Sequence, residues 1–66
     1  MNQLHEIVEQ ETRARYIVRR TYGEALRWLA FCATDPNHAG MTYEVWTLAD
    51  DATETRMSRL AEVKMP

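Results

Sequence analysis

Two short segments near the start of the chain have the alternating pattern of β-strands. Residues 3–9 (QLHEIVE) and 13–19 (RARYIVR) are rich in β-branched and aromatic residues, and the polar segment QET separates them. The pattern predicts a β-hairpin. In the second segment a two-residue period puts Ala14, Tyr16 and Val18 on one face, which we interpret as the core face, and places the arginines on the other.

The first of these segments contains two adjacent apolar residues, Ile7 and Val8. Neighbouring strand residues point to opposite faces, so either a β-bulge lies here or both faces of the strand are partly covered. The sequence leaves both alternatives open.

A helix is predicted after the hairpin, over residues 22–33. Thr21 lies three residues before Glu24, the spacing of a capping box, in which the hydroxyl and the carboxylate each accept a backbone N–H of the other residue. Pro36 and Gly40 follow the segment and are typical of a helix that has ended. The predicted apolar stripe of this helix consists of Tyr22, Ala25, Leu26, Leu29 and Ala33.

The last part of the chain predicts a strand over residues 41–49 and an ambiguous element over residues 52–65. As a strand, the second element alternates, with an interruption at Arg59 and Leu60; as a helix, it would begin with the capping-box spacing of Asp51 and Glu54. We choose the strand, because a hairpin partner would protect the edge of the preceding strand. The apolar positions of this predicted strand are Met57, Ala61, Val63 and Met65. The whole chain, residues 1–66, is then a single small α+β domain of order ββαββ, an antiparallel sheet with one helix on one face.

Composition adds limits to this picture. With 45% hydrophobic residues the chain is expected to fold, and a net charge of −2 argues against a general nucleic-acid binder. The single cysteine, Cys32, cannot form an internal disulfide, which favours a reducing compartment. No segment approaches the roughly 18 apolar residues of a membrane span, and no leader pattern opens the chain. We therefore expect a soluble, cytoplasmic protein without membrane contact.

Catalytic chemistry has little support in the sequence. Cys32 and His38 could form a nucleophile and base, or could join His5 and Asp35 in a metal site, but no paired C-x-x-C or H-x-x-x-H spacing is present. A cysteine at the end of a helical apolar stripe is more typical of a core position. With only two glycines there is no phosphate-binding loop. We expect no enzyme activity, no metal and no cofactor.

Arginines are concentrated in one part of the chain. Arg13, Arg15 and Arg19 share a predicted strand face, and Arg20 and Arg27 lie near the helix start. Such a face could follow a phosphate backbone. It could equally be neutralised by acidic residues on neighbouring strands, through cross-strand ion pairs.

Aromatic residues are more numerous than one helix and one sheet can cover. Counting about 100° per residue from Tyr22, Trp28 lies near 240° and Phe31 near 180°, away from the stripe. If Tyr43 and Val45 face the helix, the alternate residues of that strand face outward. The predicted partner-binding or self-association surface consists of Trp28, Phe31, Trp46 and Leu48, together with Arg13, Arg15 and Arg19.

In architecture the chain resembles small accessory proteins of bacteriophages and mobile elements, including some anti-CRISPR proteins in which a sheet wraps one helix. The features that carry the resemblance are the initial strands, the capped GEALRWL helix and the closing hairpin within 66 residues. The resemblance implies a non-enzymatic inhibitor or adaptor that occupies a surface on a host protein, often one that handles nucleic acid. The alternative is a small nucleic-acid-binding regulatory domain that uses the arginine face. The surplus of aromatic residues also predicts that the chain could form a homodimer.

Overall fold

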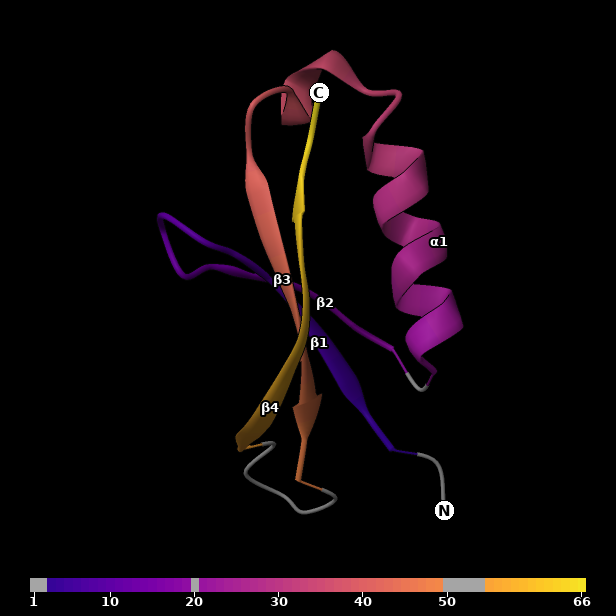
Figure 1. The fold of residues 1–66 in the computed structure, drawn as a ribbon, viewed down its shortest axis with the longest axis vertical. Helices are drawn as coiled ribbons and strands as arrows, with labels where there is room; N and C mark the ends of the chain where they lie inside the picture. Colours follow the sequence, from indigo (N-terminus) through magenta and orange to yellow (C-terminus); the bar gives the residue numbers. More distant parts are fainter. Residues whose placement is uncertain (1–2, 20, 50–54) are drawn as a thin grey trace.

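The computed structural model describes residues 3–19, 21–49 and 55–66. Its elements are β1 (His5–Glu9), β2 (Arg15–Arg19), α1 (Tyr22–Cys32), a short 3-10 helix η1 (Pro36–His38), β3 (Thr42–Leu48) and β4 (Arg56–Lys64). The predicted α+β class and the ββαββ order are confirmed, and the ambiguous last element is a strand. Residues 52–54 of that predicted element lie outside the described residues. Figure 1 shows α1 on one side of the sheet.

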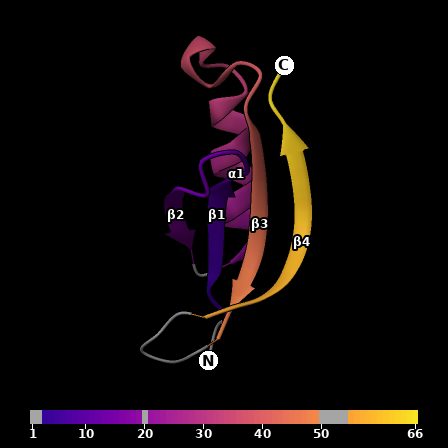
Figure 2. The same cartoon turned by 90° about the vertical axis from the view of Figure 1, so that its left-hand side faces the viewer.

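The four strands form one antiparallel sheet in the order β2-β1-β3-β4. The two central strands are therefore β1 and β3, whereas β2 and β4 form the edges, as Figure 2 shows. The chain leaves β2, forms α1 and returns on the other side of β1, so the crossover places α1 against one face of the sheet. No helix formed by the described residues lies over the opposite face (Figure 1).

A bulge in the first hairpin changes which residues share a face. The register shifts between Ile7 and Val8 because β2 contributes one extra residue, Tyr16. Val18 consequently pairs with Glu6, on the face away from the helix, so the prediction that Tyr16 and Val18 share the core face is wrong. Both alternatives proposed for the first strand hold together, since there is a bulge and Ile7 and Val8 are both fully buried.

The closing hairpin contains two further irregularities. Relative to β3, the longer strand β4 carries two extra residues, Leu60 and Met57. Leu60 coincides with the interruption of the alternation predicted at Arg59 and Leu60. Both extra residues are exposed, so the prediction that Met57 belongs to the apolar face is wrong. Bulges of this kind, with charged residues beside them, protect an edge strand from pairing with another chain.

Helix α1 begins as predicted. The Thr21 hydroxyl accepts the backbone N–H of Glu24 at 3.1 Å, and the Glu24 carboxylate accepts the backbone N–H of Thr21 at 3.2 Å. The capping box is thus confirmed. The helix ends at Cys32, and Ala33 is its C-cap rather than its last residue.

The buried side of α1 is turned relative to the predicted stripe. Ala25, Leu29 and Cys32 are the buried residues, whereas Leu26 is 39% exposed and Trp28 is half-buried. At about 100° per residue, the buried side is centred roughly 50° away from the predicted centre, toward Trp28. The cause is tertiary, because the aromatic side chains of the sheet meet α1 on that side.

The helix-side core is a cluster contributed by α1, the central strands and the chain's C-terminal end. It consists of Ile7, Ala25, Leu29, Cys32, Tyr43, Val45 and Met65. The prediction that Tyr43 and Val45 face the helix is confirmed, and Ala61 and Val63 of β4 pack against the cluster. Within residues 3–19, 21–49 and 55–66, no helix has the length and apolar character needed to cross a membrane.

Candidate functional site

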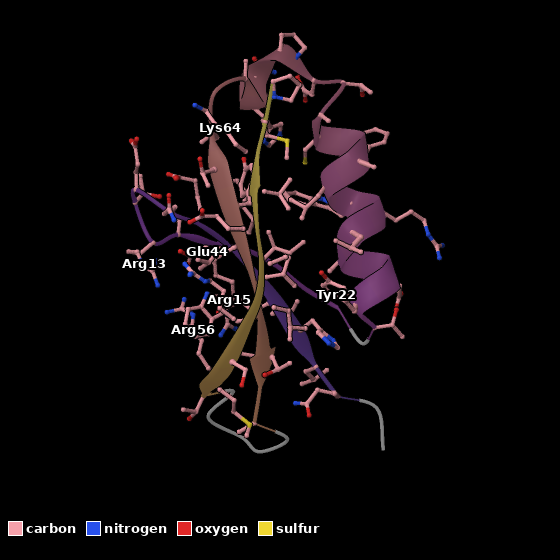
Figure 3. All side chains as sticks on the ribbon, viewed as in Figure 1. Arg13, Arg15, Tyr22, Glu44, Arg56 and Lys64 are labelled. Carbon is pink, nitrogen blue, oxygen red and sulfur yellow. The ribbon has the colours of Figure 1, made fainter. Side chains whose placement is uncertain are left out.

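The sheet face opposite α1 contains a buried carboxylate on each central strand. Glu6 of β1 is fully buried, and its two oxygens accept the Nε–H groups of Arg15 from β2 and Arg56 from β4. Glu44 of β3 is 3% exposed. Figure 3 shows Arg13, Arg15, Glu44 and Arg56 together on the side of the sheet away from α1. The arginine–glutamate network consists of Glu6, Glu44, Arg13, Arg15, Arg56 and Arg59.

Glu44 is surrounded by donors on both oxygens. Its Oε1 accepts Trp46 Nε1–H at 2.9 Å and an Arg13 N–H at 3.0 Å, while its Oε2 accepts the Gln10 amide at 3.0 Å and Arg59 at 3.4 Å. The hydrogen bonds from Trp46 and Gln10, with the bond and charge of Arg13, lower the pKa of Glu44 to about 2 against the opposing effect of burial. The carboxylate is therefore ionised at neutral pH.

The predicted arginine surface is largely engaged within the protein itself. Arg13 and Arg15 both hold buried carboxylates, although each side chain keeps just under half of its surface exposed. The side chain of Arg19 lies outside what the structure describes. A phosphate backbone would have to compete with these internal ion pairs for the guanidinium groups, so the self-neutralising interpretation of the charge pattern fits the contacts.

Two of the predicted interaction residues lie in the same face as this network. Leu48 is fully buried, so the expectation that it forms part of an exposed surface is wrong. Trp46 is half-buried, and its indole N–H is bound to Glu44. The sequence pattern suggested that nothing could cover this face. Arg15 of β2 and Arg56 of β4, one from each edge strand, converge on Glu6 at this face.

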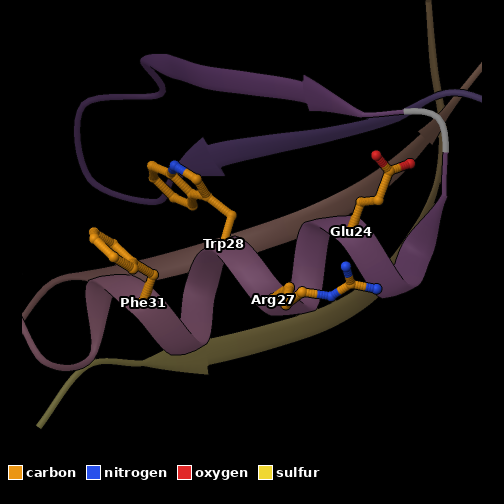
Figure 4. A pocket seen from close by; sticks show the side chains of 4 residues that line it. All are labelled: Glu24, Arg27, Trp28 and Phe31. Atoms are coloured by element: carbon orange, nitrogen blue, oxygen red, sulfur yellow. The ribbon is translucent and has the colours of Figure 1, made fainter.

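The other two predicted residues, Trp28 and Phe31, lie together on α1. With Glu24 and Arg27 they line an open groove of about 370 Å³, shown in Figure 4, which we call the α1 groove. Phe31 is 73% exposed, which confirms that it points away from the core. The predicted surface is therefore divided, because Trp28 and Phe31 lie on the helix side of the sheet and Trp46 and Leu48 on the other.

Aromatic rings pack against Trp28, one of the residues that line the α1 groove. Residues 24, 27, 28 and 31 follow the i, i+3, i+4, i+7 spacing that forms one helix face. The Trp28 ring packs against the rings of Tyr16 and Tyr43, with centroids 6.0 and 5.8 Å away. His38 adds a third ring, at 6.0 Å. The indole is thus held on one side while it still contributes to the groove.

Arg27 differs from the other arginines whose side chains the structure describes. Arg13, Arg15, Arg56 and Arg59 all hold carboxylates. Arg27 forms no ion pair or hydrogen bond with the described part of the chain. The neighbouring Glu24, in contrast, is occupied by the N–H and hydroxyl of Thr21. The groove therefore combines a carboxylate that already accepts two hydrogen bonds with a guanidinium that has no partner among the described residues.

Glu24 was not predicted as an interaction residue, and Arg27 was named only beside the arginine face of the nucleic-acid alternative, not in the predicted partner-binding surface. A helical wheel could have predicted that they lie beside Phe31, because at about 100° per residue both fall within roughly 60° of it. The wheel could not reveal that Arg27 has no carboxylate partner among the residues that the structure describes, since ion pairs such as Arg13–Glu44 and Arg56–Glu6 join segments far apart in the sequence.

The thiol of Cys32 has the surroundings of a core residue. It is 2% exposed, and its pKa is raised by burial and then by the charge of Asp35. Both effects oppose formation of a nucleophilic thiolate. His38 binds the Tyr43 hydroxyl through Nδ1 at 2.5 Å, and its ring packs against the ring of Trp28. In residues 3–19, 21–49 and 55–66, no group of three or more His, Cys, Asp or Glu side chains is placed to hold a metal ion.

Comparisons with protein family models, with curated proteins and with solved structures find no match to this chain.

Proposed function

We propose that this chain is a non-enzymatic protein-binding module that docks on its partner through the α1 groove. The observation that carries the proposal is the exposed Phe31 ring beside the half-buried Trp28 in a concave surface. Tryptophan and arginine are among the residue types most enriched at binding hot spots, and a large exposed aromatic ring gains most from burial in a partner.

The order that the fold already imposes on α1 and Trp28 supports docking through the α1 groove. The capping box holds the start of α1, and ring contacts with Tyr16 and Tyr43 hold Trp28. Side chains that are already ordered lose little entropy when a partner binds. A small module can then bind well through a small contact area.

The narrower expectation concerns the identity of the partner. We predict that the partner is a host protein that handles nucleic acid or acts in defence, and that the chain inhibits it or serves as an adaptor by occupying its surface. This prediction is based on the resemblance to accessory proteins of mobile elements. Direct nucleic-acid binding is less favoured, because Arg13 and Arg15 already neutralise buried carboxylates.

Site-specific photo-crosslinking in cells that naturally express the chain tests the proposal. A benzoylphenylalanine at position 31 should form a discrete adduct with one protein on irradiation. The matched control carries the same group at position 60, because Leu60 is also apolar and exposed but lies on β4.

An adduct formed from position 31 and absent from position 60 supports docking through the α1 groove. Its partner, once purified, should bind the wild-type chain and lose about tenfold or more in affinity for Phe31→Ala, as expected for an aromatic hot spot. The proposal is overturned if position 31 gives no protein adduct, or if both positions give the same pattern.

A further inference from the structure

We infer that the occupant of the α1 groove is an acidic protein segment that places a carboxylate on Arg27 and an apolar side chain against Trp28 and Phe31. The inference rests on the proposed function and specifies its partner. It follows from the charges, the volume and the location of the groove.

The free hydrogen-bond donors of the groove favour a partner that carries a carboxylate. One negative and one positive side chain, Glu24 and Arg27, line the groove, but they differ in the hydrogen bonds that they already form. One Glu24 oxygen already accepts the Thr21 backbone N–H at 3.2 Å and its hydroxyl at 3.0 Å. Arg27 has no such contact with the described residues, and a guanidinium matches a carboxylate in two parallel hydrogen bonds. A partner carboxylate would therefore give Arg27 the hydrogen-bond acceptor that the described residues do not supply.

The volume of the groove selects a short segment. About 370 Å³ lies near the lower end of the roughly 300–1,000 Å³ typical of ligand pockets. Trp28 and Phe31 provide the aromatic part of the groove lining. A side chain such as Leu or Phe can fill that space, with an acidic residue beside it to reach Arg27.

A second copy of this chain fits the groove less well. Helix α1 has 11 residues, so it is about 16 Å long. Contact between two helices of this length is too short to bury the roughly 1,200 Å² or more that a stable dimer needs.

Selection from a random dodecapeptide library displayed on phage tests the inference. The baits are the immobilised wild-type chain and the variants Arg27→Glu, Phe31→Ala and Lys64→Glu. Lys64 is the matched control, because it is an exposed cation on β4 with no ion pair to the described residues and lies outside the groove. Circular dichroism verifies that each variant keeps its fold, which is expected because all three side chains are exposed.

The expected result is enrichment of peptides that combine Asp or Glu with a bulky apolar residue, on the wild-type chain and on Lys64→Glu. A synthetic copy of an enriched peptide should bind Arg27→Glu about tenfold or more weakly, the effect of losing one charge-assisted pair. Arg27→Glu should instead enrich peptides with Lys or Arg.

The two hypotheses fail in different ways. Enriched peptides that depend on Phe31 but lack acidic residues, or that bind Arg27→Glu as well as wild type, overturn the acidic-segment inference and leave the docking surface standing. Peptides that bind Phe31→Ala as well as wild type overturn the proposed function itself. The same holds if no peptide is enriched on the wild-type chain. Concentration-dependent dimerisation that Phe31→Ala abolishes would assign the groove to a second copy and overturn the inference.

Discussion

Replacing Glu44 by glutamine removes one buried charge from the arginine–glutamate network and nearly preserves its shape. The amide oxygen can still accept Trp46 Nε1–H, which lies 2.9 Å from the carboxylate. The amide nitrogen, however, replaces an oxygen that accepts Gln10 and Arg59, so donors then face donors. Arg13 and Arg59 lose their central anion, but both are about half exposed and can turn to water.

The size of the effect follows from the pKa of Glu44. Its drop from an ordinary 4.5 to about 2 corresponds to about 3 kcal/mol, because one pKa unit is worth 1.36 kcal/mol. Solvent screening of the half-exposed guanidinium groups reduces this upper value, and we expect Glu44→Gln to cost about 1–2 kcal/mol at neutral pH. A chain of 66 residues has a total stability of only about 3–10 kcal/mol, so the loss is easily measured.

Urea unfolding followed by circular dichroism, repeated between neutral pH and pH 2, measures this loss and its pH dependence. A carboxyl whose folded pKa is depressed stabilises the protein above its unfolded pKa, and this contribution disappears as the pH falls through the folded pKa. The stability difference between wild type and Glu44→Gln should thus be constant above about pH 5 and should shrink toward zero between 4.5 and 2.

Glu62→Gln is the matched control for this experiment. Glu62 contacts Arg59 at 3.6 Å, but its side chain is 50% exposed, and its replacement should change stability by less than about 0.5 kcal/mol. If Glu44→Gln is as stable as wild type at neutral pH, or if the difference does not depend on pH, the electrostatic account of this face is refuted.

Three further predictions concern the helix. Thr21→Ala should lower the free energy of unfolding by about 1 kcal/mol because it removes the cap of α1, whereas the exposed Thr34→Ala serves as a control in the same urea titration and should have a smaller effect. Leu29→Ala, which opens a cavity in the core, should cost about 2–5 kcal/mol, while Phe31→Ala should change stability by less than about 0.5 kcal/mol; equal losses would place Phe31 in the core. The Cys32 thiol, buried and with a raised pKa, should react with iodoacetamide far more slowly in the native protein than in urea, and mass spectrometry that finds rapid native labelling would contradict its burial.

Local interactions made part of this fold predictable. The capping box joins Thr21 to Glu24, three residues apart, so its spacing is visible in the sequence. The strand character of residues 56–64 followed from alternation and from the need to cover the edge of β3. The exposure of Phe31 followed from its angle on the helix. Each of these depends on neighbours along the chain or on a regular period.

The candidate site depended instead on contacts between distant segments. Tyr16 forms a bulge that moves Val18 to the other face, and a regular two-residue period cannot reveal an extra residue. The burial of Leu48 was not predicted either, because the alternation along β3 places it on the face away from α1 and does not show what packs there.

The order of the helix and strands and the exposure of Phe31 follow from local patterns along the chain. The tertiary structure alone decided which charges are satisfied. Glu6 binds both Arg15 and Arg56, and Arg56 lies 50 positions after Glu6 in the chain. Only the sheet order brings these three residues together. Arg27 lies on the helix, beyond this network, and keeps its charge free of described partners. The physical reason is that a charge pair requires two side chains within a few ångströms of each other, a distance that only the folded chain sets.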